Sequence, residues 1–230
     1  MELASKPVVL FATPTFNKSV SVDFHASMLS TITEMVKQRI PYGFRAVAGN
    51  QFVDVARNEL VHYFLTSSEG YTDLLFMDAD QGWDGKALTR LFGYSQGIVA
   101  ALPPLKTDPP AYVCESITGV IDGNLFQAWQ AGTGCMRIKR EVFERMDKAY
   151  PELQDMTKQA NPWPHTPYFQ RGNTKYGFLG EDIFFCRQWT EMGEMVWIDP
   201  DVTFQHHGGR IWRGNLYDHL IATGKLQQRA

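Results

Sequence analysis

The sequence predicts a single α/β domain: a mostly parallel central sheet with helices on both faces and a small antiparallel extension. Strand and helix patterns alternate through residues 8–102, an order that favours parallel strands joined by crossover helices. The strand patterns are continuous apolar runs, which are typical of strands covered on both faces. After residue 104 the pattern changes to short strand-like pieces separated by turns.

Each element of the first half has its own signal. Apolar runs place strands at residues 8–12, 44–48, 74–77 and 98–102. Apolar residues at helical spacing predict helices between these strands, marked by Met28, Leu29, Ile32, Met35 and Val36, by Val53, Ala56, Leu60, Val61, Phe64 and Leu65, and by the short segment 86–92.

The second half is less regular. Residues 112–113, 119–121 and 125–129 are strand-like and predict the antiparallel extension. Residues 150–176 are rich in Pro, Gln, Asn and Thr, and long irregular segments inside compact domains are usually functional or mobile. Aromatic residues there, and Trp83, could stack on a sugar or base or could simply pack. Without repeats or a linker, residues 1–230 are expected to form one domain.

Bulk properties indicate the class of protein and its compartment. The 230 residues are 44% hydrophobic and 20% charged, as in ordinary globular proteins, and the net charge of −3 provides no broad attraction to nucleic acid or anionic lipid. Cys114, Cys135 and Cys186 cannot all pair, which favours buried free thiols in a reducing compartment. The N-terminus is interpreted as a first strand rather than a signal peptide, and no apolar run reaches the roughly 20 residues of a membrane span. We therefore expect a cytoplasmic protein.

Asp78 and Asp80 are the strongest chemical signal. They follow a buried apolar run, at the strand end where open α/β sheets bind ligands. A spacing of two keeps both carboxylates on one side of an extended chain. Two such oxygen ligands suit Mg²⁺ or Mn²⁺, because like charges at a buried strand end repel unless a cation joins them. The alternative is a solvated pair capping the turn before Gly82.

An ordered set of segments resembles the GT-A glycosyltransferases, and small family-2-type members encoded by bacteriophages and large viruses in particular. These segments are distributed along most of the chain, and they are residues 9–15, 56–58, 74–80, 132–138, 180–182 and 202–208. The resemblance implies a GT-A fold, Rossmann-like, with a nucleotide-binding half at about 1–103 and an acceptor-side half at about 104–230.

The resemblance also implies residue roles. Thr13, Pro14 and Thr15 would hold the nucleotide base and ribose, and Arg57 and Asn58 would lie near the nucleotide and its phosphates. Asp80 would ligate the metal directly, with Asp78 nearer the ribose or a metal-bound water. Gly134 would belong to a strand lining the donor-sugar pocket. A late histidine near the metal would be His206 or His207, and the spacing to Gly208 favours His206.

Glu181 and Asp182 complete the implied site. A transferase that inverts the anomeric carbon needs one base for the acceptor hydroxyl, and Asp182 matches the family's base position. Glu181 would orient Asp182 or bind an acceptor hydroxyl. The simpler interpretation is that both residues cap the helix that follows, where acidic residues are favoured.

The predicted function is therefore inverting, metal-dependent transfer of a sugar from a nucleotide diphosphate, a UDP-hexose by family habit, with Mn²⁺ or Mg²⁺. The acceptor stays open among a glycan, a lipid-linked sugar, a protein and a hydroxymethylated DNA base. The alternatives are a haloacid-dehalogenase-like phosphatase, a nucleotidyltransferase, and a nucleotide-sugar-binding module without turnover.

Overall fold

The protein is described by a computed structural model over residues 6–156 and 165–226. Its helices are α1 (Val22–Gln38), α2 (Val53–Thr66), α3 (Gly85–Leu88), the 3-10 turn η1 (Thr89–Gly93), α4 (Arg140–Ala149), α5 (Glu152–Met156), α6 (Glu181–Glu191) and α7 (Leu216–Ala222). Its strands are β1 (Val9–Thr15), β2 (Tyr42–Ala48), β3 (Asp73–Met77), β4 (Gln81–Trp83), β5 (Ile98–Ala100), β6 (Cys114–Asp122), β7 (Leu125–Ala131), β8 (Cys135–Lys139), β9 (Gly172–Thr174), β10 (Gly177–Leu179), β11 (Val196–Ile198), β12 (Phe204–His207) and β13 (Ile211–Gly214).

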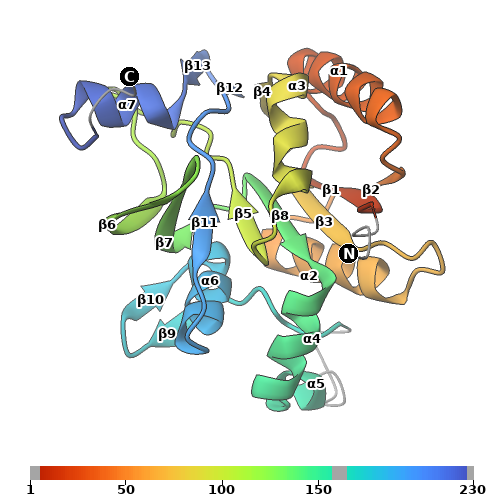
Figure 1. Cartoon of the computed structure of the whole chain (residues 1–230). Coiled ribbons are helices and arrows are strands. Elements are labelled where there is room, and N and C mark those ends of the chain that lie inside the picture. Colours follow the sequence, from red (N-terminus) through yellow and green to blue (C-terminus); the bar gives the residue numbers. More distant parts are fainter. Residues whose placement is uncertain (1–5, 157–164, 227–230) are drawn as a thin grey trace, which may run out of the picture.

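A central sheet in the order β2-β1-β3-β8-β5-β11-β7-β6 organises the domain (Figure 1). Strand β1 is parallel to both β2 and β3, and β5 is parallel to β11. Strand β8 lies antiparallel between β3 and β5, and β7 and β6 extend the far edge with antiparallel pairing. The carboxyl ends of β1, β3 and β5 therefore meet at one edge of the sheet.

Helices cover both faces because side chains alternate along each strand. Leu10, Ala12, Leu74 and Phe76 pack with apolar residues of α2, α4 and α6. Val9, Phe11, Leu75 and Met77 pack in a second cluster with α1, α3 and η1. The continuous apolar runs in the sequence thus reflect burial on two sides.

A small three-stranded sheet, in the order β13-β12-β4, forms where the first half of the chain meets the last. Strand β4 begins directly after Asp80 and pairs antiparallel with β12, with His206 opposite Gln81. The backbone N–H of His207 also donates to the carbonyl of Asp80 at 2.8 Å. This pairing brings residues more than 120 positions apart to one edge of the central sheet.

The predicted fold class is confirmed: the domain is mixed α/β, and most of its central strands run in one direction. The position of β8 between β3 and β5 is not apparent from the sequence pattern. Leu29 and Val36, which match the helical spacing of α1, are exposed rather than buried. Within the described residues, no helix has both the length and the apolar character needed to cross a membrane.

Candidate functional site

A cavity of about 330 Å³ opens at the carboxyl edge of the central sheet. Its size falls at the lower end of the roughly 300–1,000 Å³ typical of small-molecule sites. Six residues singled out from the sequence line it: Arg57, Asp78, Gly134, Glu181, Asp182 and His206. The remaining lining residues come from α2, β4 and the segments that flank β5, β6 and β7, and they are Val53, Gln81, Leu102, Pro103, Leu105, Val113, Gly132 and Thr133.

The side chain of Asp78 is paired with Arg57 of α2. The guanidinium of Arg57, only 4% exposed, donates from Nη2 to Asp78 Oδ1 at 3.1 Å. Arg57 also faces Glu181, with 3.5 Å between Nε and Oε1, and lies over the ring of Phe76. Burial raises the pKa of Asp78 above its ordinary value, although Arg57 opposes that shift. A buried cation of the chain therefore joins two of the predicted site carboxylates.

Asp80 is more open, with its side chain 44% exposed. Lys106 Nζ donates to Oδ2 at 2.5 Å, and His206 Nε2 lies 3.5 Å from Oδ1. Partial burial by itself would raise the pKa of Asp80, but His206 and Lys106 outweigh it and hold this pKa at about 2. Asp80 is therefore a carboxylate at any physiological pH.

The two adjacent histidines face opposite sides of β12, as consecutive strand residues do. His206 Nδ1 lies 2.8 Å from the carbonyl of Pro104, and because a carbonyl only accepts, Nδ1 carries the proton. That contact aims Nε2 at Asp80. His207 lies beside α1 instead, with 2.8 Å between Nε2 and Asp23 Oδ2. Of the two histidines predicted as alternatives for the metal site, the structure brings the imidazole of His206 to Asp80 and that of His207 to Asp23.

Glu181 and Asp182 begin α6 at the wall of the cavity. Asp182 Oδ1 accepts from the N–H of Ile183 at 2.8 Å, so the residue does contact the helix start. Burial, followed by the neighbouring charge of Glu181, raises the pKa of Asp182. A carboxylate with a raised pKa is a stronger base, which fits the predicted role. The N-cap of α6 is Gly180 and no side chain caps the helix, so Glu181 and Asp182 are acidic residues of its first turn, where the helix dipole favours them.

Four buried polar atoms of the cavity residues have no hydrogen-bond partner among the described residues. They are Arg57 Nε and Nη1, Gln81 Oε1 and Thr133 Oγ1. Buried polar groups are normally paired, and leaving one unpaired costs about 1–3 kcal/mol. Arg57 only donates and Gln81 Oε1 only accepts, so a ligand that pairs with these atoms needs both acceptor oxygens and hydroxyl donors. Sequence reasoning missed Gln81 and Thr133, although both adjoin motifs that it identified.

Gly134 is required by close packing at the cavity wall. A Cβ at this position would lie 2.6 Å from Gln81 Nε2 and 3.4 Å from Asp78 Oδ2. The carbonyl of Gly134 accepts from the Asp78 N–H at 3.0 Å. This glycine lets β8 approach the aspartate.

Other predicted residues lie at the same edge without lining the cavity. Thr13 and Thr15 are buried and share the α1 side of β1 with Val9 and Phe11, and half-buried Pro14 lies on the side of Asp78. Asn58 points away from the cavity: its amide donates to the carbonyl of Phe169 at 2.8 Å and accepts from its N–H at 2.9 Å. Asn58 thus holds the irregular segment against α2.

The aromatic residues of that segment mostly pack. Tyr168 and Phe169 are buried, and Phe169 stacks on Phe185 of α6. Trp83 is also buried, with its indole N–H donating to Thr31 at 2.9 Å. Trp163 lies outside the described residues.

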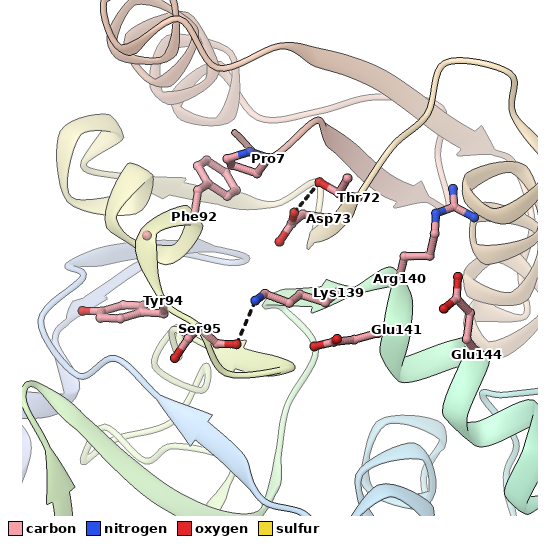
Figure 2. Close-up of a pocket in the computed structure, with 11 residues that line it drawn as sticks. Pro7, Thr72, Asp73, Phe92, Tyr94, Ser95, Lys139, Arg140, Glu141 and Glu144 are labelled. Atoms are coloured by element: carbon pink, nitrogen blue, oxygen red, sulfur yellow. Dashed lines mark hydrogen bonds between the residues drawn. The ribbon is translucent and has the colours of Figure 1, made fainter. Parts of the chain in front are cut away.

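A larger cavity, about 510 Å³, lies at the opposite edge of the sheet (Figure 2). It is bounded by the start of β3 and the end of β8. Two of its charged groups are paired within the chain, since Lys139 donates to the carbonyl of Ser95 and Asp73 accepts from Thr72. Open α/β sheets bind ligands at the carboxyl ends of their strands, so we place the functional site at the smaller cavity.

The donor atoms near Asp80 fit a divalent cation as a partial ligand set. Asp80 and the Nε2 of His206, which lies 3.5 Å from Oδ1, would supply two ligands to Mn²⁺ or Mg²⁺, which commonly add waters and substrate phosphates, whereas Asp78 is held by Arg57. The described residues include no group of three or more His, Cys, Asp or Glu side chains arranged as a metal cage. Phosphate oxygens of a ligand would therefore have to complete the coordination.

No protein-family model and no curated protein matches the sequence. Among solved structures, A197 from STIV is similar at TM-score 0.52 and 20% identity, over 87% of this chain and 86% of that one. Mannose-1-phosphate geranyltransferase from Thermus thermophilus has TM-score 0.47 and 13% identity, over 91% and 76% of the two chains. A glycosyltransferase involved in glycosylation of the major capsid of PBCV-1 has TM-score 0.38 and 9% identity, over 70% and 71%. The likeness to A197 shows a shared fold and no more.

Proposed function

We propose that this protein is an inverting glycosyltransferase that takes a sugar from a nucleotide diphosphate, with UDP-hexose the first donor to test. One observation carries the proposal. A cavity at the carboxyl edge of the sheet collects Asp78, Arg57 and Asp182 together with unpaired buried polar atoms. Sugars and phosphates are the ligand class that supplies many oxygens to such a surface.

The chain's own groups supply the proposed chemistry. The acceptor hydroxyl oxygen bonds to the anomeric carbon as the bond from that carbon to the diphosphate oxygen breaks, and the electron pair leaves with the diphosphate. Asp182 accepts the hydroxyl proton. Arg57, fixed by Asp78 and Glu181, offers the N–H groups of Nη1 to the donor's oxygens. A cation held by Asp80 and His206, with Asp78 nearer the ribose or a metal-bound water, would stabilise the negative charge on the diphosphate.

Thr13, Pro14 and Thr15 are proposed to contact the nucleotide, on the family resemblance and on their place at the end of β1. The segment that follows β1 contacts the residue between the two aspartates: Ser21 N–H donates to the carbonyl of Ala79 at 2.9 Å. His207 is left out of the proposed ligand set because it contacts Asp23.

Slow donor hydrolysis tests the proposal without knowledge of the acceptor. The protein is incubated with UDP-sugars and Mn²⁺, and UDP release is followed for the wild type and for Asp80→Asn. We expect release by the wild type only. Parallel reactions cover the alternatives: pyrophosphate release from a nucleoside triphosphate and a sugar 1-phosphate would indicate a nucleotidyltransferase, and aryl phosphate cleavage a phosphatase. Donor binding without any product would indicate a binding module, and any of these three results would reject the proposal.

A further inference from the structure

The ammonium of Lys106 contacts the carboxylate oxygen of Asp80 to which a metal ion would bind. Its Nζ lies 2.5 Å from Asp80 Oδ2, while the other carboxylate oxygen faces His206. Asp78 is neutralised in the same way by Arg57. The sequence alone suggests that an added cation is needed to relieve the repulsion between the two aspartates. In the structure, Arg57 and Lys106 already relieve it.

The position of Lys106 is built into the local packing. A Cβ at residue 208 would lie 3.1 Å from Lys106 Cδ and 2.9 Å from Trp212 Cζ3, so glycine there makes room for the lysine stem. The loop that carries Lys106 is tied down nearby: Leu105 N–H donates to the carbonyl of Ala111 at 2.7 Å, and Asp108 pairs with Arg210. His206 also contacts this loop through Pro104.

The two cations differ in how easily they can leave. Arg57 is buried and contacts two carboxylates, whereas the Lys106 side chain is 35% exposed and contacts one. A lysine ammonium is a point charge on a flexible four-carbon stem and commonly binds phosphate. A divalent cation brought to Asp80 would be repelled by an ammonium on the same carboxylate. Lys106 must therefore move before a metal can bind there.

We propose that Lys106 is an exchangeable counter-ion of Asp80, which excludes a divalent cation until the diphosphate of a nucleotide draws the ammonium away. This inference rests on the proposed function, and specifically on its metal site. The proposal predicts that metal and nucleotide bind cooperatively, because the release of Lys106 from Asp80 couples the two binding events.

Manganese binding tests this directly, with the electron paramagnetic resonance signal of free Mn²⁺ as the readout. Affinity is measured with and without UDP for the wild type, Lys106→Met and the control Lys86→Met, which removes an exposed lysine from α3. We expect Lys106→Met to bind Mn²⁺ about 10-fold more tightly without UDP, and the gain in affinity that UDP provides to shrink correspondingly. Lys86→Met should match the wild type. Adding Asp80→Asn to Lys106→Met should remove the tight binding.

An unchanged or weaker Mn²⁺ affinity in Lys106→Met overturns the inference, and so does the absence of Mn²⁺ binding in every variant. UDP-sugar binding in EDTA is measured on the same samples by thermal shift. Donor binding there with no Mn²⁺ binding would reject the role of Lys106 and leave the nucleotide-sugar function standing. No donor binding under any condition would reject the proposed function itself.

Discussion

Replacing Asn58 with alanine should destabilise the fold while leaving donor binding almost unchanged. The Asn58 side chain makes two buried hydrogen bonds to the backbone of Phe169, at 2.8 and 2.9 Å. Alanine would remove both partners of Phe169 and leave its N–H and carbonyl buried and unpaired. Each such group costs about 1–3 kcal/mol, so the free energy of unfolding should fall by about 2–6 kcal/mol.

Urea unfolding followed by circular dichroism measures this change. Asn173→Ala, at an exposed position of β9, is the matched control and should stay within about 0.5 kcal/mol of the wild type. Donor affinity of Asn58→Ala, measured below the unfolding transition, should change by less than about 3-fold because the amide faces Phe169 and not the cavity. A stable variant that has lost donor binding would refute this reasoning and return Asn58 to the nucleotide site.

The remaining predictions concern the cavity. Asp182→Asn should keep donor affinity and lower the transfer rate by about 10²–10⁴-fold, measured as kcat with a competent acceptor, and equal rates would remove Asp182 as base. Asp80→Asn should abolish Mn²⁺-dependent UDP release yet change the free energy of unfolding by less than about 1 kcal/mol, because its ion pair is exposed. Because protonated Asp182 cannot accept a proton, and burial and Glu181 raise its pKa, kcat/KM should fall on acidification with a midpoint above 3.8, as a pH–rate profile would show. Gly134→Ala should weaken donor binding in calorimetry, since its Cβ would lie 2.6 Å from Gln81 Nε2.

The parts of the fold that follow local patterns could be predicted from the sequence. The runs at 8–12 and 74–77 are apolar throughout because both faces of the sheet are covered, and β1 and β3 follow them closely. The position of β8 could not be predicted this way. Its insertion between β3 and β5 depends on long-range pairing after an excursion through β6 and β7, and no periodicity encodes that.

The candidate site likewise has residues that the sequence predicts and a residue that only the structure identifies. Asp78, Asp182 and His206 belong to recognisable segments, and the structure brings them to one cavity edge. Lys106 lies in a proline-rich loop with no motif, and only the pairing of β12 with β4 and the packing against Gly208 place it on Asp80. Leu29 and Val36 show the converse: their spacing is helical, but the positions that they occupy on α1 are exposed to solvent.

The central claim is that the cavity beside Asp78 binds a nucleotide-diphosphate sugar. A thermal-shift panel of UDP-, GDP-, dTDP- and CMP-sugars, each with Mn²⁺ or with EDTA, tests it most directly. A ligand at 100 times its Kd stabilises the native state by about 2.7 kcal/mol, which for a domain of this size raises the Tm by about 5–10 °C. We predict that shift for at least one sugar nucleotide with Mn²⁺, and a smaller one with EDTA. An unchanged Tm with every sugar nucleotide, with and without Mn²⁺, would contradict the account.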